Sequence, residues 1–204
     1  MAAIIIGVIL AGGLARRMGG GDKALKVLAG RTLLDHAIQR ARPQVKRLVL
    51  NANGDPGRFA SAGLPVIADS LPGFLGPLAG ILAALEWALA NVPESDTVAS
   101  FATDAPFFPA DLVERLDEAR RRAGVPLAAA RSGGQAHPVF GLWPVTLAPT
   151  LASALDAGER KIDRFTARHG IAYADYPAKP HDPFFNINTP DDFATAAAQW
   201  RVAS

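Results

Sequence analysis

The chain contains no cysteine among its 204 residues. This absence excludes disulfide bonds, thiolate nucleophiles and cysteine-based zinc sites, and it fits a reducing compartment. The chain has four histidines, and their spacing is not that of metal ligands: His36, His137, His169 and His181. The sequence indicates no pairing of a nucleophile with a base. We expect His36 to lie on the surface of a helix.

A strong charge imbalance and a long hydrophobic run are also missing. The formal net charge is only +2, so bulk basicity gives no support for nucleic-acid binding. The run Arg120-Arg121-Arg122 is expected to end a helix, where cations interact favourably with the helix macrodipole. The N-terminal apolar run, about seven residues over 4–10, is too short for a signal peptide or a membrane span. We therefore expect a cytoplasmic protein with no membrane or nucleic-acid partner.

Apolar strand-like runs alternate with helical patterns along most of the chain. We expect strands over residues 4–10, 47–51, 65–68, 98–102, 127–130 and 138–143, and helices over 32–42, 77–91, 109–123 and 146–157. Strands that are almost continuously apolar are covered on both faces of their sheet. The pattern predicts an α/β fold: one Rossmann-like, doubly wound, mostly parallel sheet with helices on both faces, in a single domain over residues 1–204.

Two helix boundaries carry specific signals. Pro109 is expected at the first position of a helix that ends just before Gly124. Near the C-terminus, Thr189 suits an N-cap and Pro190 the first helical position, with Asp191 and Asp192 in the first turn. We expect this last helix to run to about residue 200, after a short strand over 172–176.

A glycine-rich cationic loop follows the first expected strand. It spans residues 10–23 and contains Gly12, Gly13, Arg16, Arg17 and Lys23. Ligands of open α/β sheets bind at the carboxyl ends of the strands, and three fixed cations on a pliable backbone suit a polyphosphate. The loop has no Gly-x4-Gly-Lys-Ser/Thr sequence and matches the dinucleotide fingerprint poorly.

Polar residues end three other expected strands. Asn51, Asp69 and Asp104 each follow an apolar run, so they should converge on one edge of a parallel sheet. Asp104 is placed to hold a hard divalent cation, since magnesium takes only one or two protein carboxylates beside water and phosphate oxygens. The alternative is that Asp104 only forms a turn before Pro106.

Two further segments have both a structural and a functional interpretation. Gly76-Pro77-Leu78-Ala79-Gly80 begins a helix without a polar cap, so its N–H groups could face an anion or the two glycines could serve packing. Asn186 and Asn188 flank Ile187 at the strand period, which puts both amides on the same side of an extended segment. They could contact a polar ligand or cap the next helix.

The loop over residues 10–23 resembles the signature of nucleotidyltransferases that activate a phosphorylated partner. In combination with later segments in the same order, covering residues from about 5 to 195, the chain resembles the molybdenum cofactor guanylyltransferases. Those segments are Asn51-Ala52-Asn53, Asp69-Ser70, Gly76-Pro77-Leu78-Ala79-Gly80, Asp104-Ala105-Pro106, His137-Pro138, Ala157-Gly158-Glu159-Arg160 and Asn186-Ile187-Asn188-Thr189-Pro190. One departure is Thr103, where a cysteine often precedes the aspartate.

The resemblance implies a nucleotide-diphospho-sugar transferase-like fold and a reaction. GTP and molybdopterin, or its molybdenum-loaded form, would give the guanine dinucleotide cofactor and pyrophosphate with Mg²⁺. The implied GTP-binding residues are Leu10, Ala11, Gly12, Gly13, Lys23, Asn51, Asp69 and Asp104. The implied catalytic residues are Arg17, Lys23 and Asp104, with Asp104 as metal ligand and with Asn186 and Asn188 on the pterin side.

Other functions stay open at this point. A cytidylyltransferase acting on the same pterin is expected to carry Ala-Ala-Gly where this chain has Ala11-Gly12-Gly13, which favours guanine. Another sugar- or alcohol-phosphate nucleotidyltransferase, or a non-catalytic nucleotide sensor or scaffold, are the remaining alternatives. Cofactor-delivery chaperones or molybdoenzymes are the expected protein partners.

Overall fold

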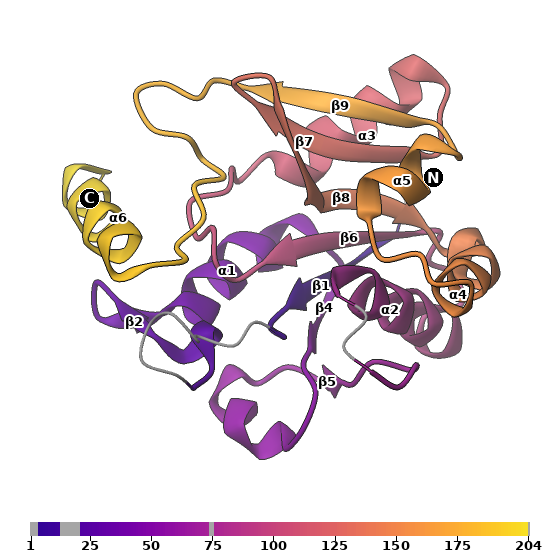
Figure 1. Ribbon diagram of the computed structural model, residues 1–204, viewed down its shortest axis with the longest axis horizontal. Helices are drawn as coiled ribbons and strands as arrows, with labels where there is room; N and C mark the ends of the chain where they lie inside the picture. The colour runs from indigo at the N-terminus through magenta and orange to yellow at the C-terminus, as the bar shows by residue number, and fades with distance from the viewer. Residues whose placement is uncertain (1–3, 13–20, 74–75, 204) are drawn as a thin grey trace.

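The central feature of the computed structural model is a sheet whose strands come from both ends of the chain (Figure 1). The structure describes residues 4–12, 21–73 and 76–203, and side chains up to residue 200. In these residues the sheet has seven strands in the order β5-β4-β1-β6-β8-β7-β9. They are β1 (Ile5–Leu10), β4 (Arg47–Asn51), β5 (Val66–Ile67), β6 (Thr97–Ala102), β7 (Leu127–Ser132), β8 (Gln135–Pro144) and β9 (Ile171–Tyr176).

Strand β8 is the exception to a parallel arrangement. It pairs antiparallel with both β6 and β7, whereas β1 pairs parallel with β4 and β6, and β7 pairs parallel with β9. The cause lies in Gly133 and Gly134, the two residues between β7 and β8, which both have positive φ angles of 54° and 83°. A two-residue turn of this kind joins antiparallel neighbours, because a parallel connection needs a long crossover.

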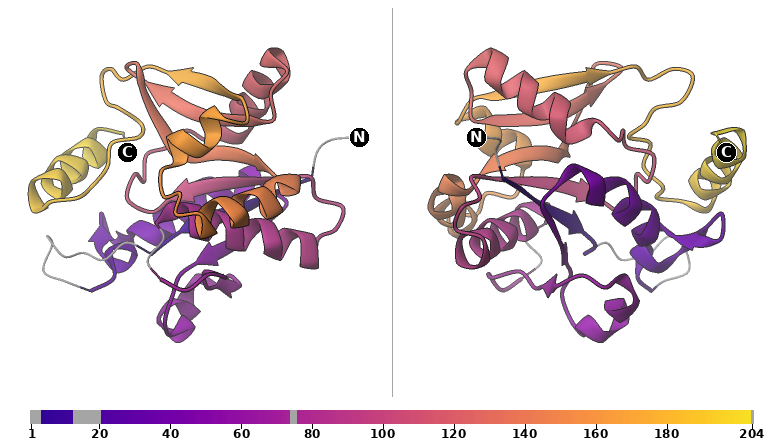
Figure 2. Two further views of the ribbon diagram at one scale, coloured as in Figure 1. Left: turned by 45° about the vertical axis from the view of Figure 1, so that its right-hand side comes forward. Right: turned by 180° about the vertical axis from the view of Figure 1, so that it is seen from behind.

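Helices cover both faces of the sheet (Figure 2). One face packs on α1 (Leu33–Ala41) and α3 (Leu112–Ala123) around Ile9, Leu50 and Phe101. The other packs on α2 (Pro77–Asn91), α4 (Ala148–Asp156) and α5 (Ile162–Ala167) around Val8, Val98 and Trp143. The mostly parallel, doubly wound α/β fold predicted from the sequence is confirmed.

Short elements complete the chain. A second, two-stranded sheet is a hairpin of β2 (Val27–Leu28) and β3 (Arg31–Thr32), turned at Ala29 and Gly30, whose φ angles are 50° and 82°. The short 3₁₀ helices are η1 (Lys23–Leu25), η2 (Arg42–Gln44), η3 (Pro56–Ala62) and η4 (Val145–Leu147). The sequence pattern did not predict these elements. All of them except the seven-residue η3 are two or three residues long, and so few residues carry no period.

The last helix, α6 (Pro190–Ala203), lies to one side of the sheet beside the hairpin (Figure 1). Its start is the predicted cap: the Asp192 N–H donates to Thr189 Oγ1, and Asp192 Oδ2 accepts from the Thr189 N–H. Leu28, Leu33 and Ala196 form the buried contact between hairpin, α1 and α6.

The prediction that His36 lies on a helix surface is wrong. Its side chain is buried, its Nε2 lies 2.7 Å from the carbonyl oxygen of Leu28, and its ring packs 4.1 Å from that of Trp200, centroid to centroid. The hairpin and α6 cover this side of α1. The pattern within α1 could not reveal that cover.

The prediction that Pro109 begins a helix is also wrong, because α3 begins at Leu112. The Gln44 amide reaches this turn from η2, donating to the Pro109 carbonyl oxygen and accepting from the Val113 N–H at 2.9 Å. A side chain distant in sequence thus satisfies a free N–H of the first turn.

The predicted end of α3 before Gly124 is confirmed, since Gly124 is the C-cap residue with a φ of 64°. The arginines before it pair with Asp117 and Glu118.

No helix in the described part of the chain combines the length and the apolar character needed to cross a membrane.

Helix α2 approaches the end of β4 closely at Gly80. A Cβ atom there would stand 2.2 Å from Oδ1 of Asn51 and 2.8 Å from Cδ2 of Leu10. Asn51 is only 6% exposed. An added methyl group would therefore have to displace a buried, hydrogen-bonded amide.

We expect Gly80→Ala to lower the free energy of unfolding. Alanine gains about 1 kcal/mol of helix propensity, but overpacking a buried site costs about 1–3 kcal/mol. Urea unfolding of Gly80→Ala, Asn51→Ala and the double variant measures the coupling. Because of this clash, Gly80→Ala should lower the free energy of unfolding less in the Asn51→Ala protein than in the wild type. An equal loss in both proteins would contradict the prediction.

Candidate functional site

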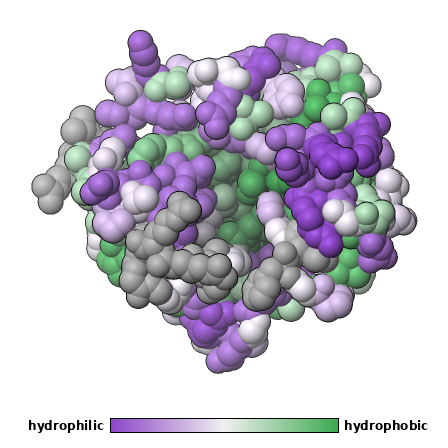
Figure 3. All heavy atoms as spheres, in the orientation of Figure 1, coloured by the Kyte–Doolittle hydropathy of each residue, from purple (hydrophilic) through white to green (hydrophobic). Residues whose placement is uncertain are grey.

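A cleft of about 410 Å³ opens at the carboxyl ends of β1, β4, β5 and β6. Figure 3 shows this face hollowed at its centre, with apolar surface between hydrophilic flanks. Among the described residues the lining is Leu10, Gly12, Lys23, Asn51, Asn53, Asp69, Gly76, Pro77, Ala102, Thr103, Asp104 and Val139. The strand ends predicted to converge do so here.

On one side of the cleft, two asparagines hold the carboxylate of Asp69. Asn51 Nδ2 donates to Asp69 Oδ1 at 2.9 Å, and Asn53 Nδ2 donates to Asp69 Oδ2 at 2.7 Å. The Asn53 side-chain oxygen accepts from the Asp69 N–H in return. These bonds fix the carboxylate at the end of β5 and leave it facing the cleft.

On the other side, the ammonium of Lys23 joins two distant segments. Its Nζ donates to Asp104 Oδ2 at 2.8 Å and to Asn188 Oδ1 at 2.6 Å. The Lys23 side chain is 9% exposed and that of Asp104 is 30% exposed. A nearly buried ammonium needs such partners, since an unpaired charge inside a protein is costly.

The segment 182–188, which we call the strap, lies across the end of β6. The Ile187 N–H donates to the Asp104 carbonyl oxygen at 2.8 Å, and the Ile187 side chain is fully buried. Asn186 and Asn188 on either side of it are exposed, as the strand period predicted. At the end of the strap, the Asn188 N–H donates to Asp192, and this bond contributes most to a lowered pKa of that carboxyl.

The N-terminal loop is described only in part. Leu10 and Gly12 line the cleft, and the buried Ala11 donates its N–H to the Asn51 carbonyl oxygen at 2.9 Å. Gly13, Arg16 and Arg17, also predicted for the site, lie outside the described residues. Lys23 is therefore the loop cation that the structure places in the cleft.

Arg58 was missed by the sequence analysis. Its Nη1 contacts both carboxylate oxygens of Asp22 at 2.5 Å, and its Nη2 donates to the Asn53 carbonyl oxygen at 2.6 Å. The guanidinium thus ties the residue before Lys23 to the segment that holds Asp69. A lone arginine in a polar stretch gave no signal of this role, whereas Asn53 could have been found from its two-residue spacing to Asn51.

The N-terminus of α2 also reaches the cleft. Gly76 occupies the N-cap position with a φ of 75° and makes no side-chain cap. Gly76 and Pro77 line the cleft, while Gly80 packs against Asn51 and Leu10. Gly80 therefore fits the packing interpretation, whereas contact between the N-terminus of α2 and an anion stays a prediction.

The donor set suits a hard divalent cation that shares its ligands with phosphate. Among the described residues no group of three or more histidine, aspartate or glutamate side chains could enclose a metal. Asp104 presents a partly exposed carboxylate to the cleft, and magnesium usually takes one or two protein carboxylates with waters and phosphate oxygens. A metal held partly by its substrate fits these residues, and a dedicated protein cage does not.

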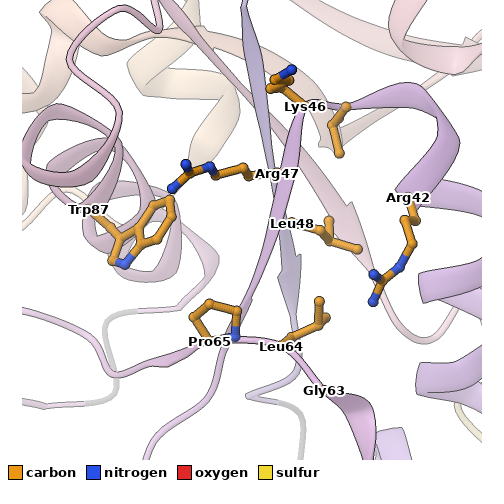
Figure 4. A pocket seen from close by; sticks show the side chains of 9 residues that line it. Arg42, Lys46, Arg47, Leu48, Gly63, Leu64, Pro65 and Trp87 are labelled. Atoms are coloured by element: carbon orange, nitrogen blue, oxygen red, sulfur yellow. The ribbon is translucent and has the colours of Figure 1, made fainter.

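A second cavity of about 340 Å³ lies at the amino end of β4 (Figure 4). Arg42, Lys46, Arg47 and Trp87 line it with apolar neighbours. Arg47 extends toward Trp87 on one side of the strand, whereas Arg42 lies with Leu48 on the other. The cations do not converge on one point, and no predicted site residue lies here.

Comparisons with known proteins agree with this geometry. Residues 7–172 match the family model of the MobA-like NTP transferase domain. The molybdenum cofactor guanylyltransferase of Bradyrhizobium sp. (strain ORS 278) is 56% identical over 191 residues, which cover 93% of this chain and 90% of that protein.

Solved structures share the fold. Molybdopterin-guanine dinucleotide biosynthesis protein A from Archaeoglobus fulgidus is 26% identical with a TM-score of 0.76, over 97% of this chain and 99% of that one. Rv0371c from Mycobacterium tuberculosis, solved as a complex with manganese, is 18% identical with a TM-score of 0.67, over 96% and 99%. The match over most of the chain and the cleft at the strand ends lead to one assignment: the chain belongs to the MobA-like NTP transferase family of nucleotidyltransferases.

Proposed function

We propose that the protein transfers GMP from GTP to the terminal phosphate of molybdopterin or its molybdenum-loaded form, releasing pyrophosphate. The observation that carries this proposal is the Lys23 ammonium bonded to both Asp104 and Asn188. It puts a cation suited to phosphates, and a carboxylate suited to a divalent ion, beside the asparagines proposed for the acceptor. The Bradyrhizobium relative, named a molybdenum cofactor guanylyltransferase, supports the substrate pair.

The nucleotide is proposed to occupy the β1–β4–β5 side of the cleft. Leu10, Ala11, Gly12 and Gly13 would contact the guanosine. The Asn51–Asp69 pair supports this placement, because its carboxylate is fixed in the cleft and can accept hydrogen bonds from a base or a ribose. Lys23, and Arg17 from the loop, would contact the triphosphate.

The acceptor is proposed to approach from the strap. Asn186 and Asn188 are exposed on it, and Asn188 touches Lys23. An acceptor phosphate held by Asn186 and Asn188 would therefore lie next to the triphosphate that Lys23 is proposed to contact. Amide side chains can both donate to phosphate oxygens and accept from a pterin ring.

The chemistry asks mainly for positioning and charge neutralisation. The attacking phosphate monoester is already anionic at neutral pH, so no strong base is required. The obstacle is bringing a dianion to a polyanion, which Lys23 and Arg17 would ease by pairing with phosphoryl oxygens. Asp104 would hold Mg²⁺, which when bound neutralises charge on the reacting phosphates. The manganese complex of the Mycobacterium protein supports a divalent ion in this fold.

We further propose that residues 1–204 act as one nucleotidyltransferase domain. Strands β1 and β9, from opposite ends of the chain, share one sheet, and the C-terminal strap contacts Lys23. We place the reaction in the cytoplasm and expect molybdoenzymes or cofactor-delivery chaperones to receive the product.

The first prediction concerns the nucleotide. Purified protein with molybdopterin and Mg²⁺ should release pyrophosphate with GTP and at least about tenfold less with CTP, ATP or UTP, since one well-placed polar contact to a base is worth about 1.4 kcal/mol or more. Pyrophosphate release is the measurement. Preference for CTP would identify a cytidylyltransferase, and GTP binding without release would identify a sensor or scaffold.

The second prediction concerns the charged pair. Lys23→Ala and Asp104→Asn should each lower kcat/KM by about 100- to 1,000-fold. The first removes a cation that would pair with the phosphoryl oxygens, and the second weakens the carboxylate proposed to hold Mg²⁺. Lys46→Ala and Asp163→Asn, which lie outside the cleft, serve as matched controls. Near wild-type transfer by a folded Lys23→Ala or Asp104→Asn variant would overturn the assignment of that residue.

A further inference from the structure

A partly buried series of hydrogen-bonded side chains, which we call the polar chain, lies behind the strap. The Ser132 hydroxyl at the end of β7 is 2.7 Å from His137 Nε2 and donates to Asp182 Oδ1 at 2.8 Å. The Ser132 residue is only 2% exposed. These hydrogen bonds connect the β7–β8 hairpin to Asp182, the first residue of the strap.

The proton order in this chain follows from elementary valence. A serine hydroxyl has one hydrogen, and Ser132 gives it to the carboxylate of Asp182. His137 must then donate its Nε2–H to Ser132 Oγ. Burial lowers the pKa of His137, and the charge of Asp182 opposes that effect. The lowered pKa favours the neutral ring, and in that form the bond to Ser132 puts the ring proton on Nε2.

Asp182 in turn shapes the start of the strap. Its Oδ1 also accepts from the Phe184 N–H at 2.9 Å, and its carbonyl oxygen accepts from the Phe185 N–H at 3.2 Å. The buried Phe184 ring stacks on His137 with centroids 4.8 Å apart and packs against Phe140 and Tyr176. Phe184 and Ile187 thus anchor the strap on both sides of Asn186.

A hydrolytic serine–histidine–aspartate triad does not fit these three residues. In such a triad the histidine lies between the other two and the serine is accessible to substrate. Here the serine lies between histidine and aspartate and is buried. The polar chain of Ser132, His137 and Asp182 is instead arranged to hold the strap in place.

We infer that Ser132, His137 and Asp182 are positioning residues, which fix the strap so that Asn186 and Asn188 face the acceptor and Asn188 meets Lys23. The inference rests on the proposed function, since it names what orients the acceptor side of that site. Three bonds hold the strap along its length: the Phe184 N–H donates to Asp182, the Ile187 N–H donates to Asp104, and Lys23 donates to Asn188.

The test compares Ser132→Ala and Asp182→Ala with Asp182→Asn. Asparagine keeps an oxygen that can accept from Ser132 and from the Phe184 N–H, so it should restore the strap. Ser153→Ala, which removes a hydroxyl that donates to the Pro149 carbonyl oxygen within α4, is the matched control. The readouts are amide hydrogen exchange of the peptide over residues 182–188, thermal unfolding, and separate KM values for GTP and molybdopterin.

We expect Ser132→Ala and Asp182→Ala to speed exchange in the strap and to raise the KM for molybdopterin about tenfold, the effect of losing about 1.4 kcal/mol of hydrogen bonding. The KM for GTP should change less than about twofold, and Asp182→Asn should stay within about threefold of wild type in both constants.

Two results would overturn the inference. One is unchanged exchange and unchanged KM for molybdopterin in both alanine variants. The other is an equal rise of both KM values with a fall in melting temperature and no rescue by Asp182→Asn, which marks a general structural role. If the wild-type protein transfers no GMP, the proposed function fails, whereas the exchange data still decide whether the chain positions the strap.

Discussion

The site depends on one buried ammonium. Lys23 Nζ bonds Asp104, 81 residues away, and Asn188, 165 residues away. These contacts bring the loop after β1, the end of β6 and the strap to one point. A lysine this buried is tolerated only because it is paired, and truncating one partner of a buried pair leaves an uncompensated charge. The geometry of the cleft is therefore coupled to the pairing of Lys23.

The sheet supplies the platform on which this pairing forms. Parallel pairing of β4, β1 and β6 puts Asn51 and Asp104 at the same edge as the loop. The two-glycine turn after β7 then reverses β8, which brings Val139 to the cleft wall and Ser132 and His137 behind the strap. One antiparallel strand thus gives the site its second wall, while the parallel half of the sheet holds the charges.

The features that could be predicted from the sequence are those with local causes. Apolar runs predicted the strands, and a polar residue after each run located Asn51, Asp69 and Asp104 at the cleft. Thr189 and Asp192 signalled the start of α6 because both capping partners lie within one turn. The misses have remote causes: the Gln44 amide sets the start of α3, α6 buries His36, and Arg58 ties Asp22 to Asn53. The residue pattern within one helix or strand contains no information about a side chain that another element supplies.

The pairing that holds the site together also has a consequence for the proposed binding of substrates. In the proposed function, a triphosphate would reach a Lys23 ammonium that is already nearly buried, and a divalent ion would reach an Asp104 carboxylate that is already paired with that ammonium. Exchange of one partner for another avoids leaving either charge unpaired, which is the costly state in a low-dielectric site. Because Lys23 also bonds Asn188, a change in the hydrogen-bond partners of Lys23 would also affect the strap. In the proposed function, nucleotide binding and acceptor placement would then be linked through the Lys23 side chain, which contacts both Asp104 and the strap.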